Sequence, residues 1–134
     1  MTAPAEPLVS LAELMFIHTV MIDRYGGHIG VRDHGLIESA LARPLASFEG
    51  RDLYPGPFLR AAVLWLGLIK NHGFVDANKR TSTMAMQRWL HREGFDLLVE
   101  TADLVEMAVR IANSGIEIEE LTRWLEDHAR PVAG

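Results

Sequence analysis

The chain has 134 residues, of which 49% are hydrophobic and 23% charged, with a formal net charge of −5 and no cysteine. These values are typical of one soluble globular domain that buries a core without disulfides or structural metals. The negative charge argues against nucleic-acid binding, which requires a basic face. The missing cysteines exclude thiolate zinc sites and cysteine nucleophiles and permit a cytoplasmic location. The sequence contains neither a signal-peptide pattern nor an apolar run of 18 residues, so we expect no membrane association.

Hydrophobic periodicity predicts a compact all-α bundle of about six helices, forming a single domain over residues 1–134. Residues 1–9 are expected to be a flexible leader. Ser10 and Glu13 form a capping box at the start of the first helix. We interpret His18, on the apolar face of that helix, as a structural histidine with one hydrogen-bond partner. The expected buried face consists of Leu11, Leu14, Met15, His18 and Ile22.

Turn and capping residues delimit the other helices. A second helix over about 33–42 ends before Pro44. A third, over 58–69, follows Pro57 and is apolar on nearly all sides, which predicts a central, surrounded helix. The run Phe95–Val99 is strand-like, but one strand cannot form a sheet alone. The remaining helices are expected from Asn78 to Glu93 with Gly94 as the stop, from the cap Thr101 to Ser114, and over about 118–129.

The stretch His72–Arg80 reads His-Gly-Phe-Val-Asp-Ala-Asn-Lys-Arg and lies between two of these helices. Because the following helix begins at about Asn78, Lys79 and Arg80 lie in its first turn. There the macrodipole and the unpaired N–H groups disfavour cations and favour an anion. Backbone N–H groups combined with lysine and arginine form a ready binding site for phosphate. The pattern therefore predicts a phosphate site at the start of this helix.

The same stretch contains the other groups that phosphate chemistry needs. Asp76 offers a carboxylate of the kind that holds Mg²⁺ together with phosphate oxygens. The imidazole of His72 can accept a proton from an attacking hydroxyl. Asn78 is suited either to capping the helix or to holding a phosphate oxygen. These groups suffice for a reaction that depends mainly on positioning and charge neutralisation.

This stretch resembles the signature of the Fic/Doc superfamily, H-x-F-x-[DE]-[AG]-N-[GK]-R, in the form carried by the Doc (death-on-curing) toxin branch. Lys79 stands where the AMP-transferring members carry a glycine. Thr83 stands where they usually carry a second arginine. The resemblance implies the all-α Fic/Doc fold. Further similarity to the same branch lies at residues 30–33, 35–44 and 52–55, within a span of about 8–129.

The resemblance implies a toxin that transfers the γ-phosphate of ATP to a serine or threonine hydroxyl of a target protein. In this branch the target is elongation factor Tu, and the result is arrested translation. His72 would be the catalytic base and Asp76 would hold Mg²⁺. The phosphates would be bound by Gly73, Ala77, Asn78, Lys79 and Arg80.

The resemblance also implies two docking surfaces. The irregular segment 45–57 is expected to be a flap beside the active site, in which Phe48, Arg51 and Tyr54 dock the target. Phe48 and Tyr54 are equally compatible with simple packing of this segment. A cognate antitoxin is expected to lay a helical segment into a groove near the active site.

Alternatives stay open at this point. The same base and metal carboxylate also suit AMP transfer to a protein hydroxyl. A module of another class would bind a nucleotide or phosphate without chemistry. In a purely structural interpretation, His72, Asp76 and Arg80 pair only among themselves. Finally, Thr122–Asp127 comes close to the inhibitory pattern [ST]-x-x-x-E-[GN] of some relatives, with Asp127 differing, so self-inhibition through Glu126 is a further hypothesis.

Overall fold

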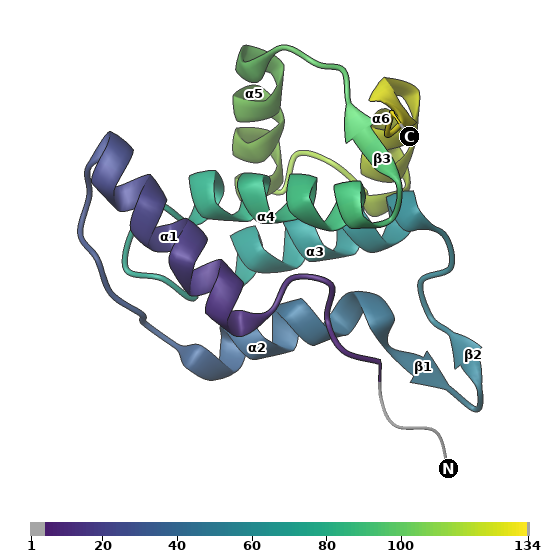
Figure 1. Cartoon of the computed structure of the whole chain (residues 1–134), viewed down its shortest axis with the longest axis horizontal. Coiled ribbons are helices and arrows are strands. Elements are labelled where there is room, and N and C mark those ends of the chain that lie inside the picture. Colours follow the sequence, from purple (N-terminus) through teal and green to yellow (C-terminus); the bar gives the residue numbers. More distant parts are fainter. Residues whose placement is uncertain (1–4, 134) are drawn as a thin grey trace.

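The computed structural model describes residues 5–133, and residues 1–4 of the expected leader lie outside them. Within the described residues the chain forms six α-helices, one 3-10 turn and four short strands (Figure 1). The all-α bundle of about six helices is confirmed. The helices are α1 (Leu11–Tyr25), α2 (His34–Ala42), α3 (Pro57–Asn71), α4 (Asn78–Arg92), α5 (Thr101–Ala112) and α6 (Ile118–His128), and the 3-10 turn η1 is Arg43–Leu45.

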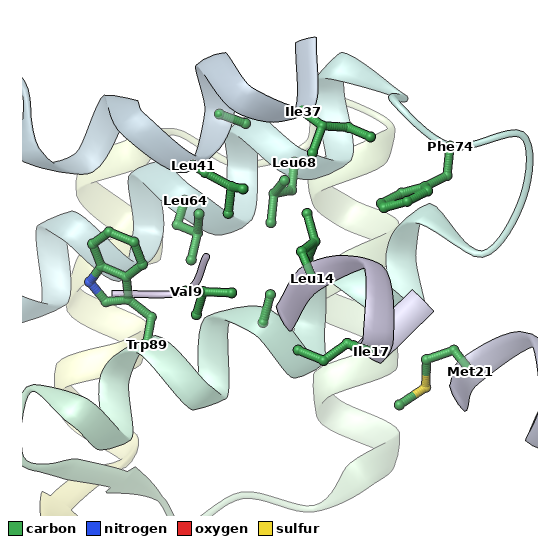
Figure 2. Close-up of a cluster of buried hydrophobic side chains, with 12 residues drawn as sticks. Val9, Leu14, Ile17, Met21, Ile37, Leu41, Leu64, Leu68, Phe74 and Trp89 are labelled. Carbon is green, nitrogen blue, oxygen red and sulfur yellow. The ribbon is translucent and has the colours of Figure 1, made fainter. Parts of the chain in front are cut away.

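The helical hairpin α3–α4 lies at the centre of the molecule, with α1 and α2 on one side and α5 and α6 on the other (Figure 1). Each side holds one hydrophobic cluster. Because α3 contributes to both clusters, it must be apolar on nearly all sides, which confirms the prediction of a central helix. The cluster beside α1 and α2 includes Leu14, Ile37, Leu64, Leu68, Phe74 and Trp89 (Figure 2). The cluster beside α5 and α6 includes Trp65, Ile69, Met86, Ile111, Leu121 and Leu125.

The first helix begins where the sequence predicts, but its buried face is turned relative to the expected one. The Ser10 hydroxyl accepts the Glu13 N–H at 3.1 Å, as half of a capping box. The Glu13 carboxylate pairs with Arg92 of α4 instead of returning to Ser10, because α1 packs across α4. The buried side chains of α1 are Leu14, Ile17, His18 and Met21, whereas the expected Leu11, Met15 and Ile22 are half-buried.

The predicted leader is shorter than expected. Val9 is fully buried in the cluster beside α1, and the Leu8 carbonyl accepts a hydrogen bond from Arg92 at 2.6 Å. The assignment of these two residues to a flexible leader was therefore wrong. Val9 belongs to the hydrophobic cluster beside α1 and α2, and Leu8 packs against it, which the local composition of the leader does not reveal.

Two short antiparallel strand pairs complete the fold. Strands β1 (Ser47–Phe48) and β2 (Arg51–Asp52) form a hairpin within the segment expected to be irregular. Strand β3 (Phe95–Leu97) pairs with β4 (Ala129–Pro131), so the expected strand does have a partner. That partner was missed because Ala-Arg-Pro carries no alternating pattern and adjoins α6 directly. Thr101 is the first residue of α5 rather than its cap.

No helix within residues 5–133 combines the length and the apolar character needed to cross a membrane.

Candidate active site

The chain reverses direction between α3 and α4 through two residues in the left-handed backbone region. His72, at the C-cap of α3, has φ 47° and ψ 50°, and Ala77, just before α4, has φ 63° and ψ 27°. Residues other than glycine rarely adopt this conformation, and each instance costs about 1–3 kcal/mol. Surrounding contacts must therefore hold residues 72–77, the signature loop, in this shape.

Asn78 provides the first of these contacts, across the signature loop itself. Its side-chain oxygen accepts the Phe74 N–H at 3.0 Å, and its side-chain nitrogen donates to the Phe74 carbonyl at 2.9 Å. The Phe74 ring is buried in the cluster beside α1 (Figure 2). Asn78 therefore locks the loop rather than capping the helix. Within the described residues no side chain caps α4, so the N–H groups of its first turn remain available to a ligand.

The Asp76 carboxylate is held by two backbone N–H groups. Oδ1 accepts the Ala77 N–H at 2.8 Å, and Oδ2 accepts the His28 N–H at 3.2 Å. These bonds, with smaller contributions from the charges of Arg80 and His28, lower the pKa of Asp76 below its ordinary 3.8 despite partial desolvation. Gly27 is needed for this approach, since a Cβ there would lie 2.7 Å from Oδ2. Asp76 is thus an ionised, half-buried carboxylate held by backbone N–H groups.

Residues 26–33, which we call the flanking segment, run beside the signature loop and restrain it. Val31 and Phe74 form an antiparallel bridge, and the Val75 N–H donates to the Gly30 carbonyl at 3.0 Å. The N–H groups of Arg32 and Asp33 both donate to the Gly73 carbonyl, at 2.7 and 3.0 Å. This contact was not predicted, because the cluster of glycines between the two helices is its sole signal in the sequence.

The His72 side chain is exposed, whereas its backbone is restrained. The Arg32 guanidinium donates to the His72 carbonyl at 2.7 Å and to the Asn71 carbonyl at 3.1 Å, which satisfies the C-terminus of α3. Arg32 and His72 line an open concavity of about 400 Å³ together with Phe74, Val75 and Asn78. An imidazole in this position is accessible to a hydroxyl of another protein.

The two cations in the first turn of α4 have different surroundings. The Lys79 side chain is exposed. Arg80 is half-buried, donates to the carbonyls of Met21 and Gly26 at 3.3 and 3.1 Å, and lies 5.6 Å from the Tyr25 ring centroid. Arg80 therefore satisfies the C-terminus of α1, and only part of its donor set remains for a phosphate. It does not pair solely with His72 and Asp76, as the structural alternative required.

Gly73, expected among the phosphate-binding residues, is buried against α2. A Cβ at this position would lie 2.2 Å from the side chain of Ile37. Its carbonyl is already occupied by the flanking segment. A close approach of backbone to helix explains why glycine stands here.

The segment 45–57, expected to be a flap beside the active site, lies at the other end of α3, so its placement beside the site was wrong. The β1–β2 hairpin leads into the N-terminus of α3, whereas the signature loop follows its C-terminus, about 22 Å away at 1.5 Å per residue (Figure 1). Tyr54 accepts from Arg43 through its hydroxyl and from Arg60 through its carbonyl, so it anchors the hairpin at that far end. Phe48 and Arg51 are exposed there. The flanking segment, not the hairpin, lies beside the signature loop.

The residues present are compatible with one Mg²⁺ ion bound together with phosphate. Within residues 5–133 no three histidine or acidic side chains converge as a ready cage. Mg²⁺ does not need one, since it is usually held by one or two carboxylates, phosphate oxygens and water. Asp76 is ionised and lies beside the uncapped start of α4, which fits that mode of binding.

A second concave surface lies next to the start of α4. It is a groove of about 460 Å³ between α1, α4 and α5, and Lys79 and Arg80 lie at its edge. Val105 and Val109 of α5 are 58% and 40% exposed on its wall, so apolar surface is open to solvent there. Its other apolar residues are Met21, Met84, Leu104 and Ala108.

Comparison with known proteins agrees with the signature. A model of the Fic/DOC family matches residues 8–90. The chain is 43% identical over 76 residues to the Toxin Doc of Mycolicibacterium smegmatis, a match that covers 57% of this chain and 58% of that protein. It is 28% identical over 117 residues to the Protein kinase doc of Escherichia phage P1, which covers 87% of this chain and 91% of that protein. The first match thus spans less than two thirds of its relative.

Proposed function

Since this chain belongs to the Fic/DOC family, we propose that it is a Doc-like toxin that transfers the γ-phosphate of ATP to a serine or threonine hydroxyl, with elongation factor Tu as the target protein. One observation carries the proposal. The exposed imidazole of His72, the ionised carboxylate of Asp76 and the uncapped first turn of α4 all belong to one restrained loop and the turn that follows it. The name of the relative from phage P1, a protein kinase, supports phosphoryl transfer.

In the proposed reaction, the hydroxyl oxygen of the target forms a bond to the γ-phosphorus while the bond to the β,γ-bridging oxygen breaks. The hydroxyl proton moves to the His72 imidazole, and ADP is the leaving group. The N–H groups at the start of α4, with Lys79 and part of Arg80, bind the phosphates. Asp76 would hold Mg²⁺, which when bound neutralises charge on the phosphate oxygens.

Lys79 explains the choice of phosphate in this proposal. Glycine at this position would leave the first turn of α4 open to an α-phosphate, whereas the side chain of Lys79, exposed in that turn, would crowd it. The nucleotide then binds in the reverse direction and presents its γ-phosphate. The variant Lys79→Gly tests this explanation. If the variant yields only phosphorylated and never AMP-modified target, steric exclusion by Lys79 is wrong.

The central experiment uses purified protein with Mg²⁺, ATP and elongation factor Tu, alone and in a bacterial lysate, followed by intact mass measurement. We expect a gain of one phosphate on a single species, absent with His72→Ala. ATP labelled in the γ- or the α-phosphate distinguishes phosphoryl from AMP transfer. Nucleotide binding without modification of any protein would contradict the proposal and favour a binding module.

We further propose that the target approaches along the flanking segment. This segment pairs with the signature loop through the Val31–Phe74 bridge, and Ile29 within it is 64% exposed. Val75 of the signature loop is 56% exposed and lines the same concavity as His72. An extended target chain can pair with such an edge and present its hydroxyl to the imidazole. The variant Ile29→Asp is expected to raise the KM for the target and to leave the KM for ATP unchanged. The hairpin variant Phe48→Asp is the matched control.

The groove between α1, α4 and α5 fits the antitoxin, for which an amphipathic helix is the expected partner. Its position at Lys79 and Arg80 means that an occupant also covers the phosphate site. Val105→Asp is expected to keep the toxicity of the chain in cells and to abolish its relief by the co-encoded antitoxin. Glu106→Gln, a neighbouring exposed change on α5, is the control.

The structure offers no support for self-inhibition within the described residues. Glu126 is exposed near the end of α6. At that end the His128 carbonyl accepts the Leu98 N–H, beyond the C-terminus of α4. The signature loop lies at the opposite end of α4. Glu126→Gly is therefore expected to leave activity unchanged.

A further inference from the structure

We propose that His18 is a positioning residue for Asp76, an inference that rests on the proposed function in assigning the metal to that carboxylate. His18 is 1% exposed on α1, and its Nε2 lies 3.0 Å from the backbone carbonyl oxygen of Asp76. The predicted hydrogen-bond partner of His18 is thus present. The partner lies in the signature loop, which the helical pattern of α1 does not reveal.

The hydrogen bond to Asp76 defines which nitrogen of the His18 imidazole carries the hydrogen. A carbonyl oxygen can only accept, so Nε2 carries the hydrogen and donates it. The ring also stacks on Phe74, with centroids 3.9 Å apart and planes inclined by 11°. His18 therefore contacts the loop at two residues, one through a hydrogen bond and one through its face.

These two contacts fix the peptide that carries the metal carboxylate. The side chain of Asp76 is bonded to the N–H groups of Ala77 and His28, and its backbone carbonyl is bonded to His18. Ala77, the next residue, is in the left-handed conformation. If the carbonyl of Asp76 loses its buried donor, this peptide can rotate, and the carboxylate moves with it.

The other end of the signature loop provides a contrast. There the carbonyl of His72 is held by Arg32, which is exposed and belongs to the flanking segment. His18 is buried in a helix that packs on α4, so it connects Asp76 to the rigid core. His18 therefore sets the position of the Asp76 carboxylate, whereas Arg32 restrains the backbone of His72, the proton acceptor.

Two variants separate the hydrogen bond from the stacking. His18→Phe keeps a ring over Phe74 and removes the donor. His18→Gln removes the ring but keeps an N–H donor, because Nε2 lies three bonds from Cβ in both glutamine and histidine. His128→Phe is the matched control, because His128 also contacts a backbone carbonyl (2.8 Å, Trp124) and an aromatic ring (4.5 Å), but on α6.

The first measurement is amide hydrogen exchange by NMR, which needs neither metal nor activity. In His18→Phe we expect the amides of Ala77 and His28, both donors to Asp76, to exchange about five-fold faster or more relative to the amides of α3. His18→Gln should retain most of the protection, and His128→Phe all of it. If all amides change in parallel, or if Phe and Gln variants behave alike, His18 only stabilises the fold and the inference is overturned.

The second measurement is ATP affinity by calorimetry with and without Mg²⁺. We expect His18→Phe to weaken the Mg²⁺-dependent part of the affinity about ten-fold, because substitution of a residue that orients a metal ligand commonly has an effect of this size. The affinity for ATP without Mg²⁺ should stay within about two-fold of the wild-type value. An unchanged Mg²⁺-dependent affinity contradicts the inference. If the wild-type chain binds no ATP, the proposed function fails, and hydrogen exchange still decides whether His18 positions Asp76.

Discussion

The two ends of the α3–α4 hairpin contain similar types of polar residue. At one end their side chains are paired with each other, and at the other end they are exposed. At the end of the hairpin away from the site, Arg60 of α3 donates to both carboxylate oxygens of Glu93, the C-cap of α4, at 2.7–3.1 Å. The Trp89 indole donates to the same carboxylate at 3.1 Å. Both charged side chains are less than one fifth exposed. Every strong polar group in this cluster is paired within the protein.

At the signature loop the side chains of His72 and Lys79 are exposed. Among residues 5–133, no side chain caps the first turn of α4, and the hydrogen bonds to the Asp76 carboxylate come from backbone N–H groups. Hydrogen bonds there hold the backbone and leave reactive side chains available. At the far end, the paired side chains of the Arg60–Glu93 cluster stabilise the fold. At the other end it uses backbone pairing to hold a strained loop whose side chains face a ligand.

The sharpest test of this comparison is His72→Ala. We expect the rate of phosphoryl transfer to fall about 10²–10⁴-fold, because a positioned proton acceptor is lost. Thermal stability should change little, because the imidazole is exposed. His91→Ala is the control, since His91 is an exposed histidine at the other end, bonded to Asp96 at 2.7 Å. Full activity in His72→Ala would remove this residue from the reaction.

The opposite result is expected for Glu93→Ala. This change leaves the Arg60 guanidinium and the Trp89 indole without their acceptor, and the free energy of unfolding should fall by about 2 kcal/mol. Phosphoryl transfer at a temperature well below the melting point should be unchanged. Asp96→Ala, which removes a pair exposed by about half, should cost no more than about 0.5 kcal/mol. Equal losses in the two variants, measured by urea unfolding, would show that the Arg60–Glu93 cluster is no stronger than a surface pair.

A third prediction concerns the pH dependence of stability at the end away from the site. There Glu13 of α1 forms ion pairs with Arg92 and Arg88 in the C-terminal half of α4. The hydrogen bond from Arg92, and then the charges of Arg92 and Arg88, lower the pKa of Glu13 below 4.5 against the desolvation that raises it. A lowered folded pKa means that the ionised carboxylate stabilises the fold above pH 4.5, and that this contribution is lost as pH falls through the folded pKa.

We therefore expect wild type to be more stable than Glu13→Gln at neutral pH, and the two unfolding curves to converge in acid. Glu106→Gln on α5 is the reference for loss of one exposed charge. A constant difference between wild type and Glu13→Gln down to the lowest pH would exclude titration of Glu13 as the cause.

The sequence was sufficient for the helices and for the signature loop because both depend on local patterns. Pro57 begins α3 and Gly94, with φ 100°, follows α4 as predicted. The signature His72–Arg80 is local in the chain, so its position between two helices follows from periodicity alone. These features need no knowledge of which segments meet in space.

The missed features all depend on distant contacts. The flanking segment meets the signature loop about 45 residues away in the chain, and its irregular glycine-rich sequence has no period that predicts pairing. The resemblance assigned the flap to the irregular segment before α3, whereas the length of α3 places that hairpin at the far end from the signature loop. A hydrogen-bond partner for His18 was predicted, but that partner, Asp76, is 58 residues away in the chain.

The smallest effect we predict concerns three consecutive hydroxyl residues at the start of α4. Ser82 and Thr83 donate to the Lys79 carbonyl, and Thr83 also accepts the Trp65 indole N–H at 3.1 Å. Thr81 is 1% exposed, and its hydroxyl has no partner among the described residues. A buried hydroxyl without a partner costs free energy, so Thr81→Val should raise the free energy of unfolding by up to about 1 kcal/mol.

Thr83→Val is the matched comparison, because it removes a partner of the Trp65 indole and should lower the free energy of unfolding by about 1 kcal/mol. Chemical denaturation of the two variants in parallel tests the difference in sign. If Thr81→Val is destabilising by as much as Thr83→Val, the Thr81 hydroxyl has a partner in solution. The start of α4 would then be as fully paired as the Arg60–Glu93 cluster, and the contrast between the two ends would rest on the exposed side chains alone.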